Sequence, residues 1–537
     1  MTTDAKVIAV NQVGYLVGGK KVAIFPNSGG SFQLIDDSTN VIVYEGTTTG
    51  PVDDKNSGKT VYYGDFSSVT QEGTFHIVCN ENQSPSFTIS TTPYDELHTG
   101  LLKGFYFLRC GMELEEKYAD KWTHDACHLT EAIVYGDEER TIETSGGWHD
   151  AGDYGKYVGP GAKAVADLFL AYEKYPNAFQ TAIPIPETDG QTPDVLHECR
   201  YELEWILKMQ DERTGGVFHK LTTLKFPGLD VMPEDDNDPL YLSPISATAT
   251  GSFAAVMAMA SRIYQDIDPA FAQTCLQAAT TAWEWLQKNP DVPGFKNPPE
   301  IHTGEYGDEV DTDERYWAAA ELYRTTGEQS YHDAFQTFAK EDFPKYSWGW
   351  ADNGGYGTIS YLLNEEFPKD EALHEQLKAG FLKEAEKMAN NSREDGYFIS
   401  LQEKDYIWGS NMGLMNNAMH LLLANHLETN GEWTSIALDH VHYLLGRNAV
   451  EMSYVTGFGE QSVKNPHHRP TVGDNVEEPV PGFVSGGANM GLQDEVAQQL
   501  KGRAPAQCFI DHIDSYATNE ITIYWNSPAV FVVSHWK

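Results

Sequence analysis

Basic residues are scarce in this chain of 537 residues: 37 Lys and Arg stand against 79 Asp and Glu, a formal net charge of −42 at pH 7. Negative charge on this scale repels the phosphates of nucleic acid and the anionic face of a membrane. We therefore expect neither as a partner. An acidic, solvated surface mainly favours solubility.

Long apolar runs, a leader and a cysteine framework are also missing. No segment approaches the roughly 18 apolar residues of a membrane span. The segment from Met1 to Lys6 lacks the charged and then apolar pattern of a secretory signal, which predicts a cytoplasmic protein. The 6 cysteines are too sparse for a disulfide scaffold, so in a reducing compartment some are free to bind metal.

The length predicts two domains, because single hydrophobic cores stop growing near about 250 to 300 residues. Residues 6 to about 92 hold short β-rich runs, such as 21–25 and 74–78, between Gly, Asn, Ser and Asp turns, and predict a small β-sandwich. After Tyr94 the spacing of apolar residues becomes helical. We expect domains at 1–92 and 93–537. The clearest predicted helices are 97–109, 195–209, 254–264, 314–325 and 412–426.

Two aspartates, Asp150 and Asp153, lie among the glycines of the segment Ser-Gly-Gly-Trp-His-Asp-Ala-Gly-Asp-Tyr (145–154). Both carboxylates could face one cavity and draw a proton from a water held between them, as a general base does. Alternatively, they cap a helix or bind calcium.

A single glutamate, Glu520, stands near the C-terminus, where the polar segment 514–521 leads into the apolar run 523–531. Partial burial would raise its pKa toward the value that a general acid needs. Alternatively, Glu520 is a charge at a helix N-terminus. Local sequence does not join Asp150, Asp153 and Glu520 in space.

Four ordered motifs together resemble glycoside hydrolase family 9, in the subgroup of cellulases with an N-terminal immunoglobulin-like domain. They are Gly-Gly-Trp-His-Asp-Ala-Gly-Asp-Tyr (146–154), Asn-Pro-His-His-Arg-Pro (465–470), Ser-Gly-Gly-Ala-Asn (485–489) and Tyr-Ala-Thr-Asn-Glu (516–520). The resemblance spans essentially the whole chain. It implies a mainly α fold, an (α/α)6 barrel catalytic domain preceded by a small immunoglobulin-like β-sandwich that is a structural companion.

The resemblance implies inverting hydrolysis. Asp153 would be the principal base, Asp150 would help to hold the water, and Glu520 would protonate the departing oxygen. Carboxyl groups about 6.5 to 9.5 Å apart leave room for that water.

Sugar contacts are implied for four further residues: His467 and Arg469 as hydrogen-bonding groups, and Trp408 and Tyr516 as aromatic contacts. The alternatives are a structural loop for the first pair and core packing for the second.

Cys110, Cys127, His128 and His149 form a Cys2His2 set with no open position, as a structural zinc site does. Alternatively, they include buried free thiols. In the immunoglobulin-bearing subgroup the matching positions bind zinc, which implies a metal that fixes the loop presenting Asp150.

Two acidic segments are candidates for structural calcium, and no organic cofactor is expected. The segment 186–194 resembles a calcium loop of the family and offers closely spaced oxygens. The segment 303–314, which runs through Asp308, Asp311, Asp313 and Glu314, is the second candidate. Alternatively, both are solvated acidic loops. The predicted ligands are Glu187, Asp189, Gln191 and Asp194 in the first, and Asp308, Asp311 and Asp352 in the second.

Three functions are compatible with these residues. The first is hydrolysis of β-1,4-glycosidic bonds in soluble cello-oligosaccharides or β-glucans. The second is an exo-acting β-glucosidase or exo-β-D-glucosaminidase on cello- or chitosan-derived oligosaccharides, with Asp235, Asp236 or Asp238 pairing a cationic amino sugar. The third, a non-catalytic sugar-binding protein, is disfavoured because all three carboxylates are present.

Overall fold

The computed structural model describes residues 8–537, which divide into two compact units. The first unit takes the described residues up to 104, then 385–471 and 475–537; the second takes 105–384 and 472–474. The segment from Met1 to Lys6 and the first residues of the predicted sandwich lie outside the described residues. Within residues 8–537, none of the helices combines the length and apolar character that crossing a bilayer requires.

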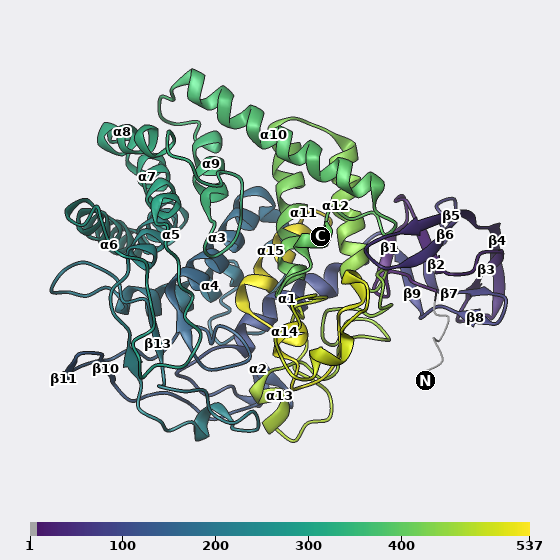
Figure 1. Cartoon of the computed structure of the whole chain (residues 1–537), viewed down its shortest axis with the longest axis horizontal. Coiled ribbons are helices and arrows are strands. Elements are labelled where there is room, and N and C mark those ends of the chain that lie inside the picture. The colour runs from purple at the N-terminus through teal and green to yellow at the C-terminus, as the bar shows by residue number, and fades with distance from the viewer. Residues whose placement is uncertain (1–7) are drawn as a thin grey trace. The chain divides into compact units, whose positions relative to one another are not determined.

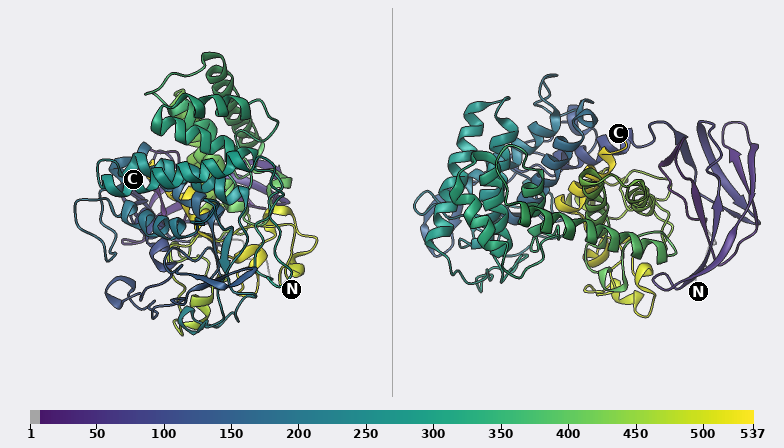
Figure 2. Two further views of the ribbon diagram at one scale, coloured as in Figure 1. Left: turned by 90° about the vertical axis from the view of Figure 1, so that its left-hand side faces the viewer. Right: turned by 90° about the horizontal axis from the view of Figure 1, so that it is seen from above.

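The first unit opens with a β-sandwich, drawn in purple in Figures 1 and 2. One sheet has the order β1-β9-β7-β3-β4 with β8 on β7, and the other has the order β2-β6-β5. The strands are β1 (Gly14–Leu16), β2 (Val22–Pro26), β3 (Ser31–Asp36), β4 (Val41–Thr47), β5 (Thr49–Asp54), β6 (Lys59–Asp65), β7 (Gly73–Cys79), β8 (Asn82–Gln83) and β9 (Phe87–Ser90).

Alternation of apolar residues builds the sandwich core, because successive side chains of a strand point to opposite faces. In β7, Phe75, Ile77 and Cys79 are buried, and they join a core that also holds Phe25 and Phe32. The predicted runs at 21–25 and 74–78 are β2 and β7, so the β-sandwich is confirmed.

Helices make up most of the remaining chain. In the first unit α11 packs against α12 and α15, and in the second α5 packs against α3, α6 and α7, while α7 also contacts α8 and α9. The helices α1, α10 and α13 each contain a boundary between the units. Their bounds are α1 (Asp95–Phe107), α2 (Glu116–Ala119), α3 (Val158–Lys174), α4 (Asp194–Lys208), α5 (Ala247–Tyr264), α6 (Pro269–Lys288), α7 (Thr312–Thr326), α8 (Gln329–Phe338), α9 (Gly354–Leu363), α10 (Glu371–Glu394), α11 (Ser410–Leu427), α12 (Gly431–Leu444), α13 (Arg469–Gly473), α14 (Tyr516–Asn519) and α15 (Ile523–Ser534).

The five clearest predicted helices are confirmed as α1, α4, α5, α7 and α11. One boundary differs by more than two residues: α5 begins at Ala247 and not at residue 254. The side chain of Ser246 accepts a hydrogen bond from the Ala249 amide and caps the helix. The small residues of this first turn carry little apolar periodicity, which is why the pattern misses it.

A small sheet of the second unit positions the Asp150–Asp153 segment. Its order is β11-β10-β14-β13-β12. The strand β12 follows Asp153 closely and pairs with β13, with Tyr157 opposite Lys220. The strands are β10 (Ala132–Val134), β11 (Asp137–Ile142), β12 (Lys156–Tyr157), β13 (Lys220–Thr222) and β14 (Tyr241–Leu242).

Within the first unit the sandwich is fastened to the segment after α10. Asp54 Oδ1 accepts a hydrogen bond from the Gly396 amide at 3.0 Å, and the Tyr63 hydroxyl donates to the Gly396 carbonyl at 3.0 Å. Asp395 Oδ2 accepts from Asn56 Nδ2 at 3.2 Å. The predicted domain boundary between residues 92 and 93 falls between β9 and α1 and stays a prediction, because the first compact unit extends across it.

The carboxyl group of Asp395 should make this junction sensitive to pH. Burial and the nearby charge of Asp54 raise the pKa of Asp395 from 3.8 to about 7. Between these values the folded state keeps a proton that the unfolded state has lost, so stability falls as pH rises through this window. The Asp395→Asn variant does not titrate there. Scanning calorimetry should show a smaller loss of Tm between pH 5 and pH 8 than in the wild type, and an equal loss would contradict the assignment.

Candidate functional site

Asp150 and Asp153 lie in an irregular loop between β11 and β12. The Asp150 amide donates to the Gly155 carbonyl at 2.9 Å, and the Gly155 amide donates to Asp153 Oδ2 at 2.9 Å, so the loop closes on itself. A Cβ at Gly155 would lie 2.8 Å from Asp153 Oδ2, which explains the glycine. Both aspartates are buried. Neither caps a helix, since the N-cap of α3 is Tyr157.

An aromatic run lies beside Asp150. The Tyr306 hydroxyl donates to Asp150 Oδ2 at 2.6 Å. The Tyr306 ring contacts Tyr157 at 4.6 Å and Trp350 at 4.8 Å between ring centroids. No local pattern links Tyr306 or Trp350 to Asp150, because each belongs to a different loop far along the chain.

Two buried glutamates of α4 hold the segment that leads to Asp150. Glu202 Oε2 accepts from the Trp148 amide at 2.6 Å, and Glu198 Oε1 accepts from Trp148 Nε1 at 2.8 Å. The fully buried Arg109 donates from Nε to Glu198 at 2.9 Å and compensates its charge. Amphipathic periodicity did not reveal these residues, since it assigns charged positions of a helix to solvent.

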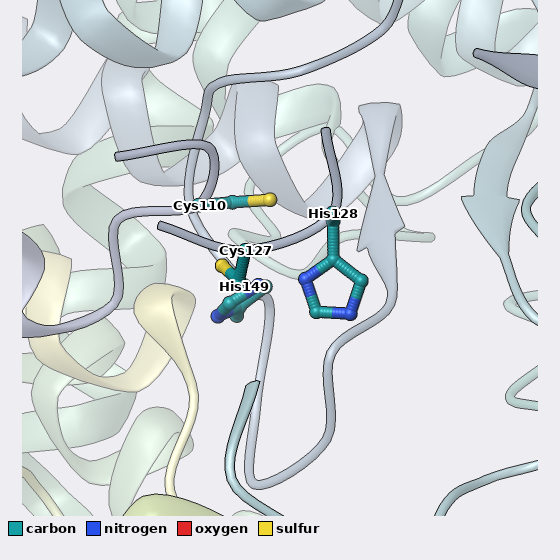
Figure 3. Close-up of side chains that lie close together, drawn as sticks. All are labelled: Cys110, Cys127, His128 and His149. Carbon is teal, nitrogen blue, oxygen red and sulfur yellow. The ribbon is translucent and has the colours of Figure 1, made fainter. Parts of the chain in front are cut away.

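The predicted Cys2His2 residues gather in one place (Figure 3). The ligand atoms of Cys110, Cys127, His128 and His149 all lie within 4.8 Å of one another. His128 Nδ1 and His149 Nε2 are buried without a hydrogen-bond partner. Interaction with Cys127 holds the pKa of Cys110 well below its usual range. Two thiols and two orphaned imidazole nitrogens at this spacing fit a tetrahedral zinc ion.

Asp236 supports this group from outside. Its Oδ2 lies 3.1 Å from His128 Nε2, the ring nitrogen directed away from the cluster, and the carboxylate is buried. A carboxylate on the second nitrogen commonly orients a metal-binding histidine. Asp236 is therefore engaged at the Cys2His2 group, whereas Asp235 and Asp238 are exposed.

Replacing Cys127 by Ser should lower both metal content and stability, because zinc binding to the folded state contributes to the folding free energy. We expect about one zinc per wild-type chain by plasma mass spectrometry, a clear loss in Cys127→Ser, and a lower Tm after chelation. Cys199→Ser is the matched control, since Cys199 is buried in α4 outside the group. If the wild-type protein is purified with zinc in the medium and still carries no zinc, the site is refuted.

Most carboxylate oxygens of the first predicted calcium loop make protein contacts, while Asp194 Oδ1 is buried without a hydrogen-bond partner. Glu187 accepts two hydrogen bonds from Arg109, both at 3.0 Å. Asp189 Oδ1 accepts from the amides of Gln191 and Thr192, each at 2.8 Å, and Asp194 Oδ2 accepts from the Ile183 amide at 2.7 Å. These contacts give the loop a structural explanation without an ion, and calcium here stays a prediction.

The second predicted calcium segment fits a cation better, although with partly different residues. Asp308 Oδ2, Asp313 Oδ1 and Glu314 Oε2 are buried without a hydrogen-bond partner, as is Asn353 Oδ1. Burial and mutual repulsion raise the pKa of Asp308 to about 7 and also raise the pKa values of Asp313 and Glu314. Orphaned oxygens of this kind are the ligands that calcium prefers.

The two other predicted ligands of this segment take different positions. Asp311 pairs with Arg315, whose Nε lies 3.1 Å from Asp311 Oδ1. Asp352 is close enough for its charge to raise the pKa values of Asp308 and Asp313. An arginine partner makes Asp311 a poorer cation ligand than Asp308.

Glu520 lies in the first unit, directly after α14, with an extended backbone (φ −70°, ψ 165°). It is not in a helix N-terminus, so that alternative is wrong. Its carbonyl accepts from the Gly486 amide at 2.9 Å, and the His467 amide donates to the Asn519 carbonyl at 2.9 Å. Backbone contacts on two sides therefore hold the predicted acid beside the predicted sugar-binding loop.

The Ser-Gly-Gly-Ala-Asn motif (485–489) forms one of those sides. The Gly487 amide donates to the Thr518 carbonyl at 3.0 Å, and Asn489 Nδ2 donates to the Ala517 carbonyl at 2.8 Å. Ser485 Oγ donates to Asn519 Oδ1 at 2.8 Å. The motif is therefore a support for the segment that ends in Glu520.

Asp511 holds the other side of the segment that ends in Glu520. The sequence did not predict this residue. Its carboxylate accepts from the amides of Lys464 and Asn465 at 2.9 and 2.8 Å, and from Asn519 Nδ2 at 2.9 Å. It thereby joins the loop carrying His467 to the residue before Glu520. One Asp among several polar residues carries no local signal for this function.

Trp408 and Tyr516 form an accessible aromatic surface near Glu520. Their ring centroids are 5.3 Å apart and the side chains are 40% and 36% exposed, so core packing is the wrong explanation for them. Burial and the charges of Asp494 and Glu520 raise the pKa of Tyr516, which places Glu520 close to this ring.

His467 and Arg469 lie in the same loop. The His467 ring is 5.9 Å from that of Tyr516, and its Nδ1 donates to the Ile513 carbonyl at 2.5 Å. Burial lowers the pKa of His467, so the neutral ring leaves Nε2 as an acceptor for a hydroxyl. Arg469 is buried at the start of α13.

The structure combines a β-sandwich with packed helices, and it carries buried carboxylates in loops and exposed aromatic rings. Residues 94–533 match the family model of glycosyl hydrolase family 9, and residues 3–84 match that of the cellulase N-terminal ig-like domain. The chain belongs to glycosyl hydrolase family 9, and it is a glycoside hydrolase.

Similar proteins cover nearly the whole chain. A cellodextrinase from Butyrivibrio fibrisolvens is 39% identical over 98% of this chain and 99% of its own length. A solved thermostable endoglucanase from Alicyclobacillus acidocaldarius has a TM-score of 0.93 at 40% identity, covering 99% of each chain. A solved Zn-binding triple mutant of the family 9 endoglucanase J30 has a TM-score of 0.90 at 31% identity, covering 97% of this chain and 99% of that one.

These matches confirm the predicted fold class. The catalytic domain is an (α/α)6 barrel of the family 9 type, and an immunoglobulin-like β-sandwich precedes it.

Proposed function

We propose that this glycoside hydrolase cleaves β-1,4-glucosidic bonds in soluble cello-oligosaccharides or β-glucans with inversion at the anomeric carbon. The observation that supports this substrate class is the match to a cellodextrinase over nearly the full length of both chains. The exo-glucosaminidase alternative has no comparable support: Asp236, one of its three candidate carboxylates, is buried against His128.

In this proposal Asp153 is the base and Glu520 the acid. Asp153 takes a proton from water as the water oxygen bonds to the anomeric carbon, while the bond to the glycosidic oxygen breaks and that oxygen takes the proton of Glu520. Asp150, bound by the Tyr306 hydroxyl, helps to hold the water. Assembly of Asp150, Asp153 and Glu520 into one site is part of the proposal and rests on the family.

The residues around Glu520 would bind the sugar next to the cleaved bond. The faces of Trp408 and Tyr516 suit the C–H groups of a pyranose ring. His467 Nε2 would accept from a hydroxyl, and Arg469 would donate to one. Stacking and hydrogen bonds to hydroxyl groups suit an uncharged glucan.

The metals would have structural functions. Zinc at the Cys2His2 group would fix the loop on which His149 directly precedes Asp150. A calcium ion at Asp308, Asp313 and Glu314 would neutralise carboxylates that otherwise repel one another. Neither ion takes part in bond cleavage in this proposal.

Incubation with cellopentaose and, separately, chitosan pentasaccharide tests the substrate class, with products followed by chromatography. We expect shorter cello-oligosaccharides from the first and no products from the second. Release of glucosamine from chitosan pentasaccharide with cellopentaose left intact would refute the proposal.

A further inference from the structure

A buried lysine that the proposed mechanism does not use lies at the start of β13. The side chain of Lys220 is fully buried, and burial lowers its pKa to about 7 against the opposing effect of the Asp153 and Glu305 charges. Its Nζ donates to Thr303 Oγ1 at 3.0 Å and to the Gly304 carbonyl at 2.6 Å. A buried ammonium is costly, so this position demands an explanation.

Three residues in and next to β13 form hydrogen bonds with the loop 303–305, and Lys220 is the middle one. On one side Thr303 Oγ1 donates to Thr222 Oγ1 at 3.0 Å. On the other, His219 Nε2 donates to the Glu305 carbonyl at 3.0 Å. Residues of β13, together with the residue before it, therefore form hydrogen bonds with three successive residues of the loop.

The next residue of this loop is Tyr306, whose hydroxyl contacts Asp150. The backbone of Tyr306 has φ +46°, in the left-handed region that a tyrosine rarely adopts. A residue in this conformation persists only where its surroundings hold it there. The hydrogen bonds to Thr303, Gly304 and Glu305 restrain the three residues before it, and Asn297 also binds the Thr303 carbonyl and the Glu305 carboxylate.

The same strand is also bound to the loop that carries the aspartates. In the pairing of β12 with β13, Lys220 lies opposite Tyr157, and its Nζ is 5.6 Å from the Tyr157 ring centroid. Asp153, Thr222 and Thr303 line one small cavity. Lys220 is therefore placed between the two loops whose relative position sets the contact of Tyr306 with Asp150.

We propose that Lys220 is a positioning residue for the water-binding aspartates: its ammonium fixes the backbone at 303–304 so that Tyr306 holds Asp150 in the orientation that presents water to Asp153. The inference rests on the proposed function for its kinetic consequence. Its structural consequence, an ordered loop at 303–306, is independent of the substrate.

The test replaces Lys220 by Met, which keeps the length and removes the ammonium. Hydrogen exchange followed by mass spectrometry should show faster exchange at 303–306 in Lys220→Met. On cellopentaose kcat should fall about 30- to 100-fold with KM within about twofold, as for a misplaced catalytic group. Lys21→Met is the matched control, since Lys21 is also fully buried and donates to the carbonyls of Leu16, Val17 and Gly19 in the sandwich. It should lower Tm and leave exchange at 303–306 unchanged.

A double-mutant cycle with Tyr306→Phe separates positioning from general destabilisation. If Lys220 acts through Tyr306, the double variant loses no more activity than the more damaged single variant. Losses in kcat that multiply would overturn the inference, as would unchanged exchange at 303–306 in Lys220→Met. Should that variant fail to fold, Thr303→Val removes the hydrogen bonds of Thr303 Oγ1 with Lys220 and Thr222 and should loosen the same segment. A wild type that leaves cellopentaose intact would refute the proposed function, while the exchange measurement still decides the positioning.

Discussion

Replacing Glu520 by Gln should lower kcat on cellopentaose by about 10³-fold and leave KM within about twofold. A positioned general acid contributes about 10²- to 10⁴-fold, and an amide cannot supply the proton. Gln has nearly the shape of Glu, and the substitution leaves in place the hydrogen bond from the Gly486 amide to the backbone carbonyl of residue 520, so the variant should fold normally. Steady-state kinetics with reducing-sugar detection measure both constants.

An activated substrate is the control for this variant. The phenolate of an aryl cellobioside with an acidic phenol leaves without needing a proton. The rate of hydrolysis of this substrate should therefore fall much less than that of cellopentaose. Equal losses on both substrates would contradict the assignment of Glu520 as acid and would point to a binding function.

Replacing Asp153 by Asn should lower kcat by about 10²- to 10⁴-fold on both substrates, because every turnover needs water to lose its proton. The amide oxygen can still accept the hydrogen bond from the Gly155 amide, so the loop should keep its shape. Kinetics at fixed pH on cellopentaose and on the aryl cellobioside measure the loss.

Asp150→Asn is the companion variant. It keeps an acceptor for the Tyr306 hydroxyl and should be less damaging than Asp153→Asn, since Asp150 only helps to hold the water. A larger loss of kcat in Asp150→Asn than in Asp153→Asn would contradict the assignment and indicate that Asp150 is the base.

Much of the fold could be predicted from local sequence. The period-two runs of β2 and β7 and the helical spacing of α4 and α11 are local properties, and so is the clustering of glycine around Asp150. The Cys2His2 group came from the resemblance, and the structure brings its ligand atoms together. Motifs therefore located the residues to which the proposed function assigns the chemistry.

The residues that hold those groups in place could not be predicted. Glu198 and Glu202 are charged residues of α4, a type that a hydrophobicity pattern assigns to solvent, yet both are buried against Trp148. Lys220 and Asp511 bind backbone that is distant in sequence, from 46 residues away for Asn465 to 84 for Gly304. Such partners are defined by tertiary contacts, and a single sequence contains no pattern that pairs them.

The stereochemistry of hydrolysis tests the central claim most directly. Proton NMR during the first minutes of cellopentaose cleavage, before mutarotation, shows the anomeric configuration of the new reducing end. An inverting enzyme with Asp153 as base and Glu520 as acid gives the α-anomer from a β-bond. A β-anomer as the first product would contradict the account, because it requires a covalent intermediate on one of these carboxylates.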